Sequence, residues 1–92
     1  MSPEIAADLA RRALVWIATD EERLLAFMAQ TGASTDDLRG GLEDPTFLGS
    51  VLDVLLMDEA ALFVFCDEHA FPYDRVAAAR AALPGGDIPN WT

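Results

Sequence analysis

Residues 44–65 read DPTFLGSVLDVLLMDEAALFVF, and this stretch decides the fold. It opens with Asp-Pro, a pair typical of a helix start, because aspartate caps free backbone N–H groups and proline needs no donor there. Apolar residues then recur at intervals of three and four, which indicates a helix. Only Gly49, Ser50 and Asp53 interrupt them before Met57. A helix that is apolar nearly all round is expected at the centre of the fold.

Asp58 and Glu59 break the apolar run in the middle of this stretch. At the start of a helix, carboxylates accept hydrogen bonds from free N–H groups and meet the positive end of the helix dipole. We therefore interpret the pair as a boundary, with one helix ending at Met57 and the next beginning after Asp58. This interpretation assigns no chemistry to the two acids.

Capping residues, prolines and glycines divide the rest of the chain in the same way, and no stretch is convincing as a strand. The sequence predicts helices over residues 3–18, 20–31, 36–39, 45–57, 59–69 and 72–83. The expected helix-start residues are Ser2, a Thr19/Glu22 capping box, Ser34 or Thr35, Asp44, Asp58 and Pro72. Gly32 is expected to end the second helix, and Gly40 with Gly41 the third. The expected buried face of the first helix is Ile5, Leu9, Ala13, Trp16 and Ile17.

An Asp-Glu pair begins both the second and the fifth predicted helix, 38 residues apart. Aligning residues 13–39 with 51–77 gives six identical pairs, which is typical of an internal repeat. Alanines of the first copy align with larger residues of the second, so that facing copies would pack small against large (Ala10/Leu48, Ala13/Val51, Ala18/Leu56, Ala26/Val64).

The predicted fold is all-α: a compact bundle of five or six short helices, built from two pseudo-symmetric three-helix repeats around the fourth and fifth helices. One helical domain would span residues 1–84, with repeat one at about 3–42 and repeat two at about 44–83. Residues 85–92 would form a C-terminal tail.

The charge balance excludes several classes of partner. Sixteen acids oppose six arginines and no lysine, giving a net charge of −10. Nucleic-acid backbones and anionic membranes attract basic proteins, so neither is expected as a partner.

The N-terminus lacks the features of a signal peptide, the apolar stretch over 51–66 is broken by acids, and the single cysteine allows no intrachain disulfide. We expect a cytoplasmic protein.

Cys66 and His69 lie three residues apart on a predicted helix, close enough for a thiolate–imidazole pair or half of a metal site. The simpler interpretation, which we favour, is a core thiol and a histidine near a helix C-terminus, where the dipole favours a cation.

The acid clusters lack the spacing of a calcium loop, and no phosphate loop, GxSxG or HExxH pattern occurs. We expect no enzyme, no catalytic residue, no cofactor and no metal site.

Asp53 lies in the middle of the most apolar predicted helix. It either marks a thin solvent-facing stripe or is buried against an arginine. We favour the stripe, because Gly49, Ser50 and Met57 fall on the same side at helical spacing.

Two segments carry a resemblance to a known family. Asp44 to Phe65 follows DPxFLxxVLDxLLxDExxLxxF, and the preceding part follows xALxWIAxDxERLxxFMAxTG; an RAALPG ending closes the last helix. This pattern resembles a family of small alphaproteobacterial proteins known only as a domain of unknown function, over most of the chain. The resemblance implies a helical fold and a bacterial cytoplasmic setting, and it implies no activity or ligand.

Three functions fit the sequence. The leading hypothesis is a non-catalytic helical module for protein–protein contact, with a homodimer as one form of it. Its candidate surface is Val54, Val64, Phe71 and Trp91, although these residues would equally suit a core, and Trp91 would either fold back or serve as a free handle. The first alternative is an acidic decoy for a basic protein, since residues 40–74 hold eight acids and no arginine. The second is a thiol or metal sensor at Cys66 and His69.

Overall fold

The computed structural model describes residues 1–84 and folds them into six α-helices, without any strand in that range. The helices are α1 (Pro3–Ala18), α2 (Glu21–Thr31), α3 (Thr35–Gly41), α4 (Pro45–Met57), α5 (Glu59–His69) and α6 (Tyr73–Ala81). The predicted all-α class is confirmed. Within the described range, no helix combines the length and the apolar character that crossing a membrane requires.

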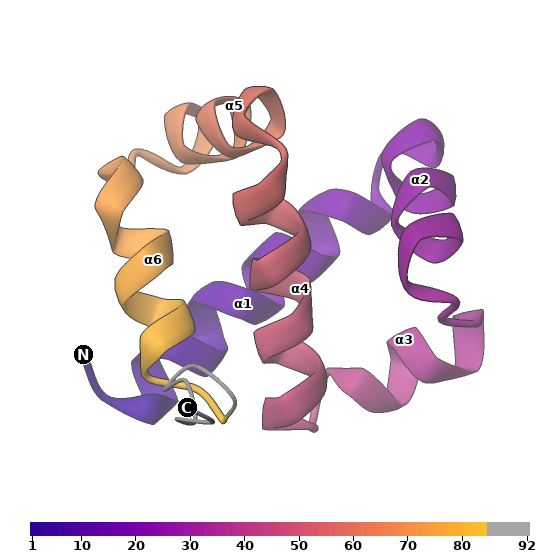
Figure 1. Cartoon of the computed structure of the whole chain (residues 1–92), viewed down its shortest axis with the longest axis horizontal. Coiled ribbons are helices and arrows are strands. Elements are labelled where there is room, and N and C mark those ends of the chain that lie inside the picture. Colours follow the sequence, from indigo (N-terminus) through magenta and orange to yellow (C-terminus); the bar gives the residue numbers. More distant parts are fainter. Residues whose placement is uncertain (85–92) are drawn as a thin grey trace, which may run out of the picture.

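The centre of the molecule is the crossing of α1 and α4 (Figure 1), which form its most extensive helix pair. From this crossing, α2 and α3 extend to one side and α5 and α6 to the other. α6 returns to pack on both central helices. The expected central position of α4 is confirmed, but its central neighbour is α1 and not α5. The reason is burial: α1 buries eight residues, whereas α5 buries two.

Small side chains on α1 let α4 approach closely. Ala10 and Ala13 are fully buried, as are Leu48 and Val51 of α4, so small residues on one helix accompany large ones on the other. The prediction that Ile5 shares this face is wrong, because Ile5 is 52% exposed and the neighbouring Ala6 is buried instead.

The helix starts follow the predicted caps with one exception. Ser2, Ser34, Asp44 and Asp58 each accept a backbone N–H bond from the first turn of their helix. The predicted Thr19 cap is wrong. Asp20 caps α2 by accepting from the Arg23 N–H at 3.1 Å, and the Thr19 hydroxyl donates to the Trp16 carbonyl at the end of α1.

The helix ends depart from the predictions at two places. α3 continues to Gly41, because neither of its two glycines adopts a positive φ, and α6 stops at Ala81 instead of Leu83. Gly32 ends α2 as predicted, in the left-handed conformation with φ of 76°. Ala70 ends α5 in the same conformation, with φ of 56°. The superposition of the two halves stays a prediction.

Candidate functional site

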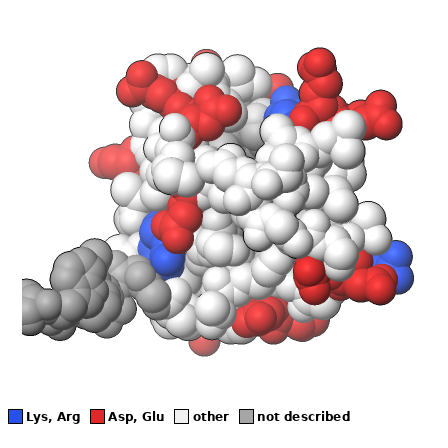
Figure 2. Space-filling model, turned by 45° about the vertical axis from the view of Figure 1, so that its right-hand side comes forward, with Lys and Arg blue, Asp and Glu red and all other residues white. Residues whose placement is uncertain are grey.

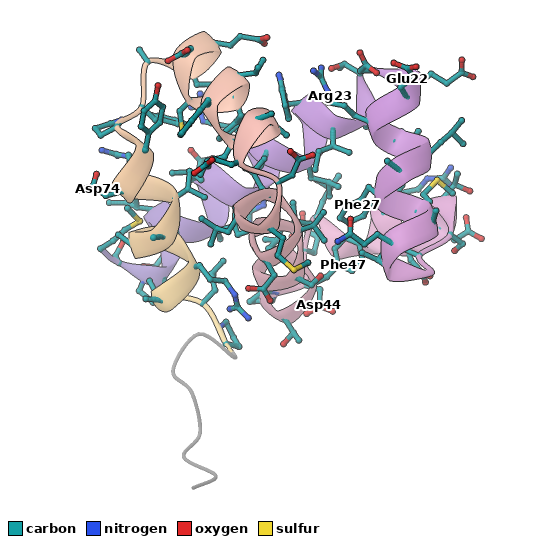
Figure 3. All side chains as sticks on the ribbon, turned by 45° about the horizontal axis from the view of Figure 1, so that its top comes forward. Glu22, Arg23, Phe27, Asp44, Phe47 and Asp74 are labelled. Carbon is teal, nitrogen blue, oxygen red and sulfur yellow. The ribbon has the colours of Figure 1, made fainter. Side chains whose placement is uncertain are left out.

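Two hollows lie along α4, the narrower one between α2 and α4 and the wider one between the end of α2, α3 and the start of α4. One has a volume of about 210 Å³ and is lined by Trp16, Ile17, Glu22, Arg23, Ala26, Phe27, Gln30, Val54, Leu55, Asp58 and Ala61. The other is wider, about 710 Å³, and is lined by Thr31, Gly32, Ala33, Asp36, Asp37, Gly40, Gly41, Asp44, Phe47 and Ser50. They meet at Phe27 and Phe47, whose rings contact edge to face with centroids 6.2 Å apart (Figure 3). We call the two hollows together the α2–α4 groove.

Buried apolar side chains form the floor of the groove. Trp16 and Phe27 are 6% and 2% exposed, and Ile17 and Leu55 are buried beside them. The Trp16 indole N–H donates to the Glu68 carboxylate at 2.9 Å, and its ring meets Phe65 edge to face at 5.4 Å. These contacts fix the tryptophan, so the floor is a preformed apolar surface.

Arg23 is the basic residue of the described groove lining, and Trp16 holds it in place. Its guanidinium carbon lies 3.7 Å from the centre of the Trp16 ring, a cation–π contact. Its Nη2 donates to the Trp16 carbonyl at 3.3 Å. The Nε atom is buried without a hydrogen-bond partner among residues 1–84. The Arg23 guanidinium therefore lies against the Trp16 ring, near the end of the groove where Glu22 stands (Figure 3).

Acidic residues stand around the groove. Glu22 and Asp58 line the narrower hollow, and Asp36, Asp37 and Asp44 line the wider one. Figure 2, with the α2–α3 side turned forward, shows a largely uncharged central surface, around which acidic side chains outnumber the basic ones that lie beside some of them. Asp44 and Asp58 also cap α4 and α5 through their Oδ1 atoms, which fixes their positions. The groove therefore combines an apolar floor with a negative rim.

The wall made by α2 is held lightly. Phe27 is the only α2 residue that is buried, and the helix packs chiefly on α1. The Phe27 ring contacts Phe47 of α4. A helix that few apolar contacts hold is expected to open locally at a low cost in free energy. With one buried residue, α2 is such a helix.

Gly41 allows the Phe47 ring to lie where it does. A Cβ atom on Gly41 would fall 2.1 Å from the Phe47 Cδ2 atom, whereas a Cβ on Gly40 would meet nothing within 4 Å. Sequence reasoning treated the two glycines alike as a helix end. The structure shows that one of them makes room for an aromatic residue of the groove.

The residues predicted as a partner surface do not gather in one place. Val54 is half-buried and lines the groove. Val64 is 44% exposed on α5, one turn after the groove residue Ala61. Phe71 is half-buried and packs against the Phe65 ring at 5.9 Å. Trp91 lies outside the described residues.

Cys66 and His69 face different surroundings. Cys66 is fully buried, and this burial, together with the nearby Asp67 charge, raises the pKa of its thiol. The His69 Nδ1 lies 3.0 Å from the Phe65 carbonyl oxygen, and its ring stacks on Phe71. Within residues 1–84, no group of three potential ligands is placed to hold a metal ion. The geometry favours a thiol that is neutral and shielded.

Asp53 is exposed, as the favoured solvent-facing stripe predicted, and it also pairs with an arginine. Arg80 of α6 donates to both of its carboxylate oxygens, with Nη2 at 2.9 Å from Oδ2. The Asp53 side chain is half exposed, so the residue is both solvent-facing and paired. The arginine lies 27 positions away, too far for helical spacing to reveal it.

Comparison with known proteins gives one result. A family model described as "Protein of unknown function (DUF3572)" matches residues 3–86, which is nearly the whole chain. The comparisons with curated proteins and with solved structures gave no match. The chain therefore belongs to the DUF3572 family of proteins of unknown function.

Proposed function

We propose that this protein is a non-catalytic interaction module that binds a segment of a protein partner in the α2–α4 groove. The observation that carries the proposal is an open groove with a buried apolar floor, one wall of which is held by a single buried residue. Grooves between helices that offer accessible aliphatic side chains, here Ala26, Val54 and Ala61, are typical of surfaces that bind peptide helices.

The dimensions of the groove favour a polypeptide over a small molecule. The narrower hollow, about 210 Å³, is below the range of about 300–1,000 Å³ typical of small-molecule sites, and the wider one is open to solvent. The α2 wall has 11 residues and is therefore about 16 Å long, enough to contact three turns of a partner helix. A chain segment would cover both hollows at once.

The acidic rim decides between partners. A second copy of this chain would bring another net charge of −10 toward that rim, so like charges oppose a homodimer through the groove. A different, basic protein meets no such opposition. The proposal thus joins the apolar contact of the leading hypothesis with the charge attraction of the first alternative, and the shielded Cys66 supports neither a sensor nor a catalytic role.

The test compares two matched substitutions on α2. Ala26 is exposed and lines the groove, whereas Ala29 is exposed on the same helix and lies outside its lining. Ala26→Arg fills the groove and adds a positive charge, and Ala29→Arg makes the same chemical change elsewhere. Arginine is a good helix former, so both variants should keep the wild-type melting temperature.

The expected result is that partner proteins captured from native cells by the wild-type chain are also captured by Ala29→Arg and are lost with Ala26→Arg. Quantitative mass spectrometry of the three captures measures this difference. If every captured protein stays with Ala26→Arg at wild-type levels, the groove is not the binding surface.

A further inference from the structure

We infer that the occupant of the α2–α4 groove is a short amphipathic helix of a partner protein, with apolar residues on one face and Lys or Arg at its borders. This inference rests on the proposed function and adds the chemistry of the partner. It depends on three features of the described residues: the helical walls, the buried aromatic floor and the sign of the rim charge.

The walls require an occupant that satisfies its own backbone. α2, α4 and α5 use their N–H and C=O groups in their own helical hydrogen bonds, so the walls offer no edge to which an extended strand could pair. A backbone that enters an apolar groove without partners loses the hydrogen bonds it made with water. In a helix, the backbone N–H and C=O groups are already hydrogen-bonded to each other. A helical peptide therefore suits this groove best.

The aromatic floor argues against a proline-rich occupant. Proline-rich segments dock on flat aromatic rings that are exposed to solvent. Trp16 and Phe27 are almost fully buried, and the Arg23 guanidinium covers the Trp16 ring. In the narrower hollow, what remains accessible is mainly small aliphatic surface, such as Ala26, Val54 and Ala61, into which larger Leu, Ile or Met side chains of a helix would fit.

The rim selects a basic helix. Five acidic residues line the two hollows, against one arginine that is stacked on the floor. The acids lie at both ends of the groove, with Glu22 near one end and Asp44 near the other (Figure 3). Lysines or arginines on both borders of the occupant would meet these carboxylates, speed its encounter with the groove and exclude acidic segments.

The experiment selects helical peptides without bias in charge. A phage-displayed library of peptides of about 14 residues, roughly four helical turns, carries apolar residues at i, i+3, i+4 and i+7 and random residues elsewhere. The bait is the full chain. We expect the recovered peptides to carry a net positive charge and to become helical on binding. Ala26→Arg should lower their affinity for the protein at least tenfold, and Ala29→Arg should not.

A second pair of variants measures the rim charge by itself. Glu22→Gln with Asp58→Asn removes two rim charges and keeps the α5 cap, because asparagine caps as well as aspartate. Glu4→Gln with Asp74→Asn removes two charges outside the groove lining. We expect the rim pair of substitutions to lower the affinity for a recovered peptide about three- to tenfold and to make that affinity less dependent on salt. The distant pair should change the affinity little.

The outcomes separate this inference from the proposed function. Peptides that are lost with Ala26→Arg but are neutral, acidic or extended overturn the basic helix and leave the groove as a binding surface. Peptides that bind Ala26→Arg as tightly as the wild type overturn both the basic helix and the groove as a binding surface. A selection that enriches no peptide also overturns both.

Discussion

Helices α2 and α5 begin alike and end alike, yet only α5 is firmly held. Each has 11 residues, starts after a capping aspartate and ends at a residue in the left-handed conformation. Trp16 of α1 contacts both helices, through Glu68 of α5 and Arg23 of α2, but α5 buries Phe65 and Cys66 whereas α2 buries Phe27 alone. Local signals therefore set where a helix forms, and tertiary packing sets how tightly it is held. The looser helix is the one that borders the groove.

The largest expected effect comes from removing the buried aromatic residue of each helix. Phe65→Ala should lower the free energy of unfolding by about 3–5 kcal/mol, because its ring is fully enclosed and contacts Trp16, His69 and Phe71. Phe27→Ala should cost about 1–2 kcal/mol less, since the cavity it leaves opens onto the groove and α2 is able to settle into it. Urea unfolding of both variants measures the difference. An equal or larger loss for Phe27→Ala would show that α2 is as firmly held as α5.

A smaller effect is expected where the two helices end. Gly32 and Ala70 occupy equivalent left-handed positions 38 residues apart, and a Cβ atom is disfavoured in that conformation. Gly32→Ala should therefore destabilise the protein by about 1 kcal/mol, and Ala70→Gly should stabilise it by about 0.5–1 kcal/mol. Thermal unfolding of the two variants gives opposite shifts in Tm. Shifts of the same sign would contradict the equivalence of the two ends.

The smallest effect concerns the thiol of α5 and its pH dependence. Burial raises the pKa of Cys66 in the folded state, so its contribution to stability is fully present below the unfolded pKa of about 8.5 and is lost as the pH rises through the folded pKa. Between pH 7.5 and about 9.5 the wild type should lose more stability than Cys66→Ala. The range stops there because Tyr73, whose pKa is also raised, titrates above it.

Thiol labelling provides the control for this prediction. A disulfide reagent should modify folded Cys66 far more slowly than the urea-unfolded chain. Labelling of the folded protein at the unfolded rate would mean that α5 opens as readily as a loosely held helix, and it would restore the thiol-sensor hypothesis.

Local sequence signals were sufficient to predict most of the fold. Serine and aspartate caps located the starts of α1, α3, α4 and α5, since each cap acts within three residues. The start of α2 was misplaced by one residue, because the Thr19 hydroxyl is used by the end of α1 and leaves the cap to Asp20. The nearly uninterrupted apolar pattern of α4 predicted its central place.

What the sequence did not reveal depends on contacts between distant residues. The buried face of α1 includes alanines such as Ala6. The spacing of large apolar residues predicted Ile5 on that face instead, because it gives little weight to alanine. The Asp53–Arg80 pair joins α4 and α6 through two residues that lie 27 positions apart in the chain. The groove arises from the angle at which α2 leaves α1, and no spacing within α2 or α4 encodes that angle. The alignment of Ala26 with Val64 was interpreted as small-against-large packing of the two copies, and it did not predict that Ala26 lines a groove.

The most direct test of a loosely held α2 that closes on a partner helix is amide hydrogen exchange of the full chain, with and without a peptide recovered by the charge-unbiased selection. We expect the α2 amides of the free protein to exchange at least tenfold faster than the α5 amides, and we expect the bound peptide to slow exchange most in α2. Equal exchange in the free helices, or peptide protection confined to elements outside the groove, would contradict this expectation.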